Sequence, residues 1–126
     1  MANISIDNLA DAITQAVREY TEDVTAAIGK EVETTADLVL KDARNLAPKA
    51  TGEYAKGFVK TNKTLPGQRR YVIWNKEHYR LVHLLEFGHA KVKGGRVDGK
   101  PHLQPAHDKY TNTMVDKIKN IIENGG

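Results

Sequence analysis

Residues 81–106 read LVHLLEFGHAKVKGGRVDGKPHLQPA, and this stretch decides how the chain is arranged. It begins with a compact apolar block that stops at Gly88. A basic, glycine-rich loop follows over residues 89–100. Pro101 and Pro105 then frame the start of the last helix, where a missing proline N–H costs nothing. The stretch therefore joins two ordered segments through a loop with fixed ends.

The elements on either side of this loop follow from apolar spacing. Residues 77–87 predict a short helix that Gly88 ends as a left-handed cap, although periodicity leaves a buried strand open as the alternative. Residues 90–100 are expected to form a second hairpin or a loose arm. Apolar residues at helical spacing predict a C-terminal helix over residues 104–124.

Upstream, a helical pattern of apolar residues fills most of residues 1–48 and ends at Pro48, because the residue before a proline is pushed away from helical angles. Nearly 40 residues is long for one helix of a small protein. Gly29 is the weak point of the pattern. We expect a kinked or broken helix, with the break near residues 27–30 and a first segment that makes subunit contacts. A single long helix that partly reaches beyond the domain is the alternative.

The region between the helices predicts a small sheet. Residues 49–52 form a turn, and the segment from Tyr54 to Asn62 is expected to be a short strand or an irregular extended piece. Residues 64–67 are a turn by composition. Residues 70–75, RYVIWN, are the clearest strand, with both faces covered. The two strands would form an antiparallel hairpin.

Together these elements predict one α+β domain over residues 1–126. A small, mainly antiparallel sheet packs against a long N-terminal helix (residues 1–48) and a C-terminal helix (residues 104–124), with the sheet region, the short helix and the basic loop in residues 49–103. The chain contains no cysteine, which excludes disulfides and thiolate chemistry and fits a reducing cytoplasm. We see neither a secretion signal nor an apolar run of membrane-spanning length.

Charge is distributed unevenly. Residues 1–48 hold nine acidic residues and four lysines or arginines, whereas residues 49–110 hold thirteen lysines or arginines and five acidic residues. Such asymmetry favours head-to-tail association or a basic surface that faces a polyanion. Two solvated faces of one small domain are the alternative explanation.

Candidate catalytic chemistry is sparse. His83, Glu86 and His89 do not have zincin spacing, so we expect the five histidines to lie at the surface or at interfaces rather than to bind metal. The only serine is Ser5, which makes a serine triad implausible. Glu86 lies inside an apolar block, where a carboxylate must be paired or exposed. It would bond a cation or a backbone N–H, or make an intersubunit or loop-anchoring contact. We predict no enzyme activity, cofactor or metal.

The basic loop could meet phosphates. It lacks the sequence of a P-loop and has no aromatic residues for stacking single strands. Its basic residues, which are candidates for facing DNA, are Lys91, Lys93, Arg96 and Lys100. A basic module that binds duplex nucleic acid is therefore the alternative function, and a solvated flexible loop is the simplest explanation.

Two motifs resemble a known family. The first is Ala43-Arg44-x-x-Ala47-Pro48-x-x-Thr51-Gly52, and the second is Leu84-Leu85-Glu86-Phe87-Gly88 followed by Pro101-x-x-x-Pro105-Ala106. In this order they resemble the neck or tail-completion family of long-tailed bacteriophages, whose members are minor tail or head–tail joining proteins. The resemblance spans residues 38–122. The chain departs from the family pattern at Tyr54, where an aliphatic residue is usual, at His102, where phenylalanine is usual, and at His89.

The resemblance implies a structural protein of the virion that is assembled in the host cytoplasm and does not catalyse a reaction. Such proteins resemble subunits of a homo-oligomeric ring, here hexameric or larger, which finishes the tail tube or joins it to the head connector. Passing duplex DNA would be a further partner, and no membrane is involved. The residues expected at the subunit or partner interface are Thr51, Gly52, Glu86, Gly88, His89, Pro101 and Pro105.

Overall fold

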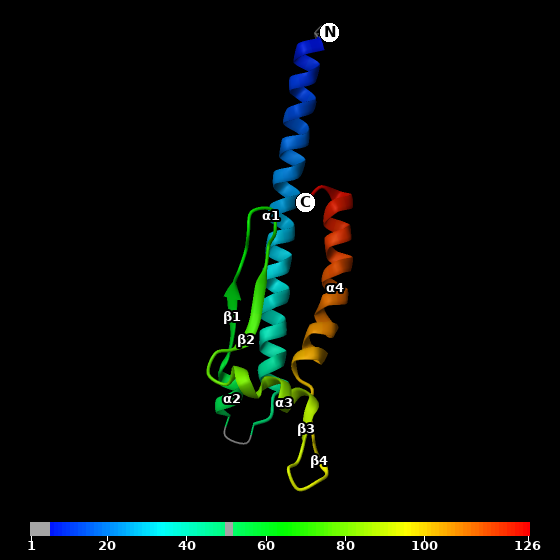
Figure 1. Cartoon of the computed structure of the whole chain (residues 1–126). Helices are drawn as coiled ribbons and strands as arrows, with labels where there is room; N and C mark the ends of the chain where they lie inside the picture. Colours follow the sequence, from blue (N-terminus) through cyan, green and yellow to red (C-terminus); the bar gives the residue numbers. More distant parts are fainter. Residues whose placement is uncertain (1–5, 50–51) are drawn as a thin grey trace.

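A single long helix, α1 (Ile6–Leu46), forms the axis of the protein, and the computed structural model describes residues 6–49 and 52–126 (Figure 1). The predicted kink or break near residues 27–30 is wrong, because α1 runs through this region without interruption. Gly29 is buried, and a Cβ atom there would lie 2.5 Å from a guanidinium nitrogen of Arg69. This glycine therefore gives room to a neighbouring side chain and does not interrupt the helix.

One side of α1 is covered by an antiparallel hairpin of β1 (Phe58–Asn62) and β2 (Tyr71–Asn75). Their register pairs Phe58 with Asn75 and Asn62 with Tyr71, which confirms the predicted hairpin. Two charged groups attach β1 to α1. The guanidinium of Arg44 donates to the carbonyl oxygen of Phe58 at 2.5 and 3.1 Å, and Lys60 Nζ lies 2.6 Å from an Asp37 carboxylate oxygen.

Two details of this region differ from prediction. The segment before β1 begins as a single helical turn, α2 (Glu53–Lys56), so Tyr54 is not in an extended segment. The faces of β2 are not both covered, because the Trp74 side chain is 38% exposed and its indole N–H donates to Thr61 Oγ1 at 2.8 Å. A strand that packs on one helix from one side has its other face in solvent.

The other side of α1 is covered by α4 (Leu103–Asn124), which runs antiparallel to it (Figure 1). This confirms the predicted C-terminal helix. The Tyr20 hydroxyl of α1 donates to the carbonyl oxygen of Ile122 at 2.7 Å, close to the end of α4. The part of α1 before Tyr20 projects beyond the rest of the protein.

Short elements close the opposite end of the molecule. A 3₁₀ turn (Tyr79–Leu81) leads into α3 (Val82–Phe87), which confirms the predicted short helix. The strands β3 (Gly88–Ala90) and β4 (Arg96–Asp98) then form a second hairpin, which is the first of the two alternatives expected for residues 90–100. Gly88 has the expected positive φ of 79°, but its ψ of −179° is extended, so it leads directly into β3 and is not a left-handed helix cap.

The arrangement is α+β, as predicted, with two small antiparallel sheets. The core is small and lies along the second half of α1. One buried cluster contains Ala47, Tyr54, Ala55 and Phe58, and the other contains Val39, Ala43 and Ala106. In the part of the chain that the structure describes, no helix is both long and apolar enough to span a membrane.

Two glycine substitutions test this account of α1 and the hairpin. Gly29→Ala should raise the free energy of unfolding by up to about 1 kcal/mol, because alanine favours the helix and the exposed Arg69 side chain can move away.

Gly57→Ala should lower the free energy of unfolding by about 2 kcal/mol, since the new Cβ overlaps the buried, hydrogen-bonded Asn75 side chain. Urea denaturation measures both, and a large destabilisation by Gly29→Ala would contradict the account of Gly29.

Candidate functional site

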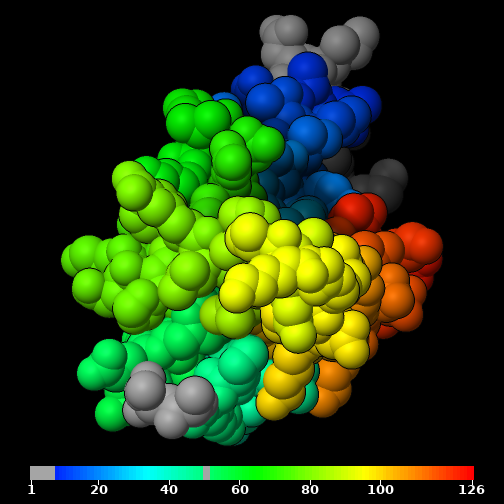
Figure 2. Space-filling model, turned by 60° about the horizontal axis from the view of Figure 1, so that its bottom comes forward, coloured from blue at the N-terminus to red at the C-terminus, as the bar shows by residue number. Residues whose placement is uncertain are grey.

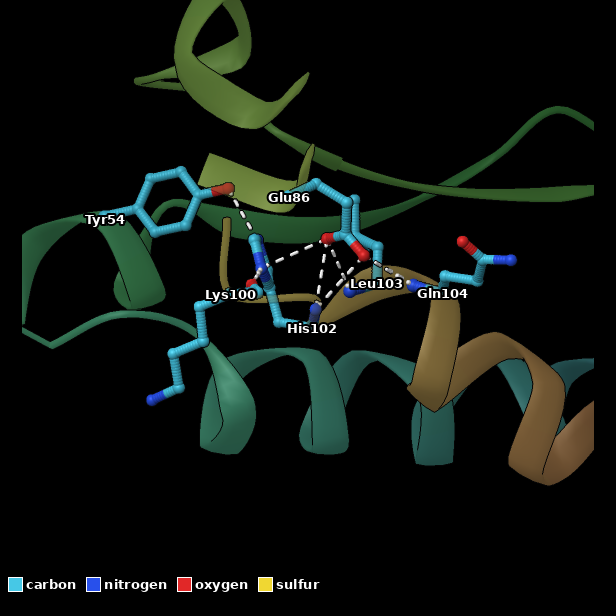
Figure 3. Close-up of polar contacts among 6 residues, drawn as sticks. All are labelled: Tyr54, Glu86, Lys100, His102, Leu103 and Gln104. Carbon is cyan, nitrogen blue, oxygen red and sulfur yellow. Dashed lines mark hydrogen bonds and ion pairs between the residues drawn. The ribbon is translucent and has the colours of Figure 1, made fainter. Parts of the chain in front are cut away.

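The carboxylate of Glu86 caps the first turn of α4 from a neighbouring helix (Figure 3). It accepts hydrogen bonds from the backbone N–H groups of His102 at 3.1 Å, Leu103 at 2.9 Å and Gln104 at 3.1 Å. The first N–H groups of a helix have no partner within the helix, and its N-terminal end carries partial positive charge. A buried carboxylate is stabilised there, which explains why Glu86 is only 3% exposed.

The imidazole of His102 lies beside this carboxylate and is fully buried. Its Nδ1 is 2.8 Å from the carbonyl oxygen of Lys100 and 3.1 Å from Glu86 Oε1. Because a carbonyl oxygen only accepts, Nδ1 carries a hydrogen and donates. In the neutral imidazole, Nε2 then accepts from the Tyr54 hydroxyl, 2.7 Å away. One histidine thus links α2, the loop before α4, and α3.

Tyr54 is held as a neutral phenol. Burial, and to a lesser extent the negative charge of Glu86, raise the pKa of Tyr54 to about 12 from its ordinary value of 10.0. The ring packs edge-on against Phe58 and His102, with centroid distances of 5.2 and 5.4 Å. Such edge-to-face contacts add to the gain from burying the rings. The hydroxyl and the ring together fix the position of His102.

Asn75 satisfies the backbone next to this cluster. Its Nδ2 donates to the carbonyl oxygen of Tyr54 at 2.7 Å, and its Oδ1 accepts from the N–H of His78 at 2.8 Å. Among the described residues, no buried side-chain nitrogen or oxygen lacks a hydrogen-bond partner. The polar groups of this interior are therefore structural and fully paired.

The predicted site residues gather at one end of the molecule, apart from Thr51, which lies outside the described residues. Gly52 precedes α2, and Gly88 and His89 open the β3–β4 hairpin. Pro101 precedes α4, and Pro105 lies in its first turn, as expected. Their role at an interface stays a prediction. For Glu86 the expected bond to a backbone N–H is confirmed, and its buried position matches the loop-anchoring alternative.

The basic residues of the loop are exposed in and beside the β3–β4 hairpin. Figure 2 shows this hairpin, in yellow, in the foreground at the centre of this end of the molecule. Lys91, Lys93, Arg96 and Lys100 are all exposed. The Arg96 guanidinium also donates to the carbonyl oxygen of Phe87 at 2.5 Å, which ties the hairpin to the end of α3. The hairpin therefore exposes positive charge to solvent, and its position relative to α3 is fixed by the hydrogen bond between Arg96 and Phe87.

Sequence reasoning missed the interior polar cluster. The expectation that the histidines lie at the surface or at interfaces is wrong for His102. The available signal was that Tyr54 and His102 both differ from the residues that the resemblance led us to expect, because these two side chains bond each other. In residues 6–49 and 52–126, no group of three or more histidine or acidic side chains is placed to hold a metal ion.

Removal of the Glu86 charge should destabilise the protein. Glu86→Gln replaces one acceptor oxygen with a donor group that faces backbone N–H groups, so the free energy of unfolding should fall by about 3 kcal/mol in urea denaturation. The matched control is Glu77→Gln, an exposed position with the same charge change, which should shift it by less than about 0.5 kcal/mol. Equal effects of the two variants would contradict the capping role.

The Tyr54 phenol should make stability depend on pH in the alkaline range. Its pKa is higher in the folded protein, so its contribution is complete below pH 10 and is lost as the pH rises through about 12. Wild type should therefore lose about 2 kcal/mol more than Tyr54→Phe between pH 10 and 12. Hydrogen bonds to Asp37 and Asp42 also raise the pKa values of Lys60 and Lys109, but both proteins share these groups. As a control, Tyr79→Phe, at an exposed position, should lose as much stability as wild type between pH 10 and 12.

Comparison with known proteins identifies the family. Residues 11–88 match the HK97-gp10-like family model, described as "Bacteriophage HK97-gp10, putative tail-component". No curated protein and no solved structure matches the chain. The matched region contains the first motif and the Glu-Phe-Gly motif, and it ends at Gly88, the first residue of β3, so it leaves out the rest of the second hairpin and α4. Because the match covers more than half of the chain, the protein belongs to the HK97-gp10-like family of bacteriophage tail components, which confirms the relationship expected from its motifs.

Proposed function

We propose that this protein is a structural subunit of the virion, a tail-completion or head–tail joining protein that forms a homo-oligomeric ring at the neck or tail end. Its membership of a family of phage tail components supports a role in the virion that requires no catalysis. The buried polar side chains of the described residues agree with this role, because each is hydrogen-bonded within the chain.

The observation that carries the ring is the polarity of the molecule along α1. The projecting start of α1 is acidic, and the basic β3–β4 hairpin lies at the opposite end (Figure 1). Unlike charges on different surfaces of one subunit favour contacts between unlike surfaces of successive copies. Such head-to-tail contacts close into a ring when the rotation between copies allows it.

The hairpin end has features of a second contact surface. Beside the basic hairpin, the side chains of Tyr79, Leu81 and Phe87 are 56%, 43% and 62% exposed. Large exposed apolar side chains gathered near one site are typical of surfaces that bind another protein. This end of the subunit would contact the tail tube or the head connector.

A second candidate function is duplex DNA binding. The four exposed basic residues of the loop support it, because phosphate contacts need only positive charge within reach. In a ring, this hairpin would face DNA passing through the lumen. In an isolated module, it would bind free duplex with strong salt dependence.

The mass of the protein in solution tests the proposed function. Light scattering across a concentration range, alone and with assembled tail tubes, should give a closed oligomer of at least six times the 14.0 kDa of one chain, or capture of the protein by the tubes. The closed oligomer would follow from head-to-tail contacts between copies. Capture would follow from binding of the hairpin end to the tube.

A persistent monomer that ignores the tubes would contradict the ring. If that monomer binds duplex DNA in low salt, duplex DNA binding replaces ring formation as the proposed function. The variant with Lys91, Lys93, Arg96 and Lys100 all changed to glutamine separates the two functions. It should keep the oligomeric mass if the hairpin does not hold the ring together, and lose DNA binding if the hairpin contacts phosphates.

A further inference from the structure

The start of α1 carries an apolar stripe that its own chain does not cover. We refer to residues 8–19 as the helical projection. The side chains of Leu9, Ile13 and Val17 follow at intervals of four and are 50%, 56% and 59% exposed. Residues at this spacing lie on one face of a helix. Tyr20 is the residue just after the projection, and its hydroxyl bonds α4. The stripe therefore lies on the part of α1 that extends beyond this contact.

An open apolar groove runs over the second half of α1, between β2 and α4. It has a volume of about 630 Å³. Its apolar lining comes from three elements and includes Val32 and Val39 of α1, Val72 and Ile73 of β2, and Leu103 and Met114 of α4. We refer to it as the α1–α4 groove. A groove of this shape is suited to the apolar face of a helix.

The helical projection and the α1–α4 groove match in length. Along α4 the groove extends from Leu103 to Met114, about 16 Å at 1.5 Å per residue. The twelve residues of the projection span about 18 Å. Because α1 is one continuous helix, the projection cannot fold back onto the groove of its own chain. An occupant with this stripe must come from another copy.

The charges of the two surfaces are also complementary. The projection holds two acidic residues, Asp11 and Glu19, and one arginine, and two more acidic residues, Glu22 and Asp23, follow it on α1. Arg70 and His107 line the groove, and the guanidinium of Arg69 lies against Gly29, one turn before the groove begins on α1. The nearest acidic residues of α1 are already paired within the chain, Glu31 with Lys117 and Glu33 with Lys60. His107 lies 3.2 Å from a carboxylate oxygen of Asp108, so Arg69 and Arg70 supply the positive charge that favours an acidic helix.

We propose that the helical projection of one copy binds with its apolar stripe in the α1–α4 groove of the next copy, head to tail. This inference rests on the proposed ring function and names the contact that would build the ring. The contact uses different surfaces on the two copies, so each subunit gives one projection and receives another.

Two complementary variants test this contact. The projection variant, Ile13→Gln with Val17→Gln, removes the stripe but retains helix-forming residues. The groove variant, His107→Glu with Thr111→Glu, places negative charge in the groove without altering its apolar lining. Each variant alone should be monomeric. Mixed, they should form pairs of one chain of each kind and nothing larger, because only one intact projection and one intact groove remain. Native mass spectrometry distinguishes these species, and circular dichroism checks folding.

The matched control lies on the opposite face of the same helix. Gln15→Ala with Arg18→Ala leaves the stripe intact and should retain the wild-type oligomer. If the projection variant also retains it, the docking mode is wrong while the ring stands. If both variants are folded and monomeric but their mixture forms no pair, the docking mode is equally wrong.

A cross-linking experiment decides the case in which wild type itself stays monomeric, which would refute the ring. The chain has no cysteine, so Ile13→Cys in one copy and Thr111→Cys in another supply single thiols for a bis-maleimide. Cross-linked pairs should form at high protein concentration only when both variants are present. Their formation would support the docking contact without a ring, and their absence would overturn it.

Discussion

The hydrogen bonding of the Glu86 carboxylate to the first turn of α4 is the interaction on which the rest of the structure depends. A buried carboxylate is costly unless it is paired or hydrogen-bonded, and here three backbone N–H groups and the His102 imidazole surround it. The bond from the N–H of Lys100 to the carbonyl oxygen of Leu85, at 2.8 Å, lies beside it. Together they fix both ends of the β3–β4 hairpin and set the direction in which α4 leaves, antiparallel to α1.

Tyr54 and His102 form one structural unit. At the two positions where the resemblance led us to expect an aliphatic residue and a phenylalanine, the chain has Tyr54 and His102, which bond each other at 2.7 Å. A single polar replacement in such a place would bury an unpaired group. As a pair they are satisfied, and the Nδ1 of His102 extends the network to Glu86 and Lys100. The motif residues Ala43, in α1, and Ala47, just after its end, are fully buried, and Arg44 bonds β1.

The architecture also separates internal from external roles. The second half of α1 lies between the β1–β2 hairpin and α4, whereas its first part extends away from the core (Figure 1). A small core of this kind leaves several large apolar side chains exposed, on the helical projection and at the hairpin end. In the proposed ring, contact with neighbouring copies and partners would bury these exposed surfaces.

The sequence by itself determined the local elements and the family. Apolar spacing and turn residues predicted β2, both hairpins, the short helix and α4, because these depend on contacts between near neighbours in the chain. The tertiary structure alone decided that α1 continues through Gly29, that residues 53–56 form a helical turn, and that Glu86, His102 and Tyr54 meet in the interior. These outcomes rest on partners 16 to 48 residues apart. Only packing brings such groups within hydrogen-bond distance. The residue type alone does not show whether a polar side chain is buried or exposed.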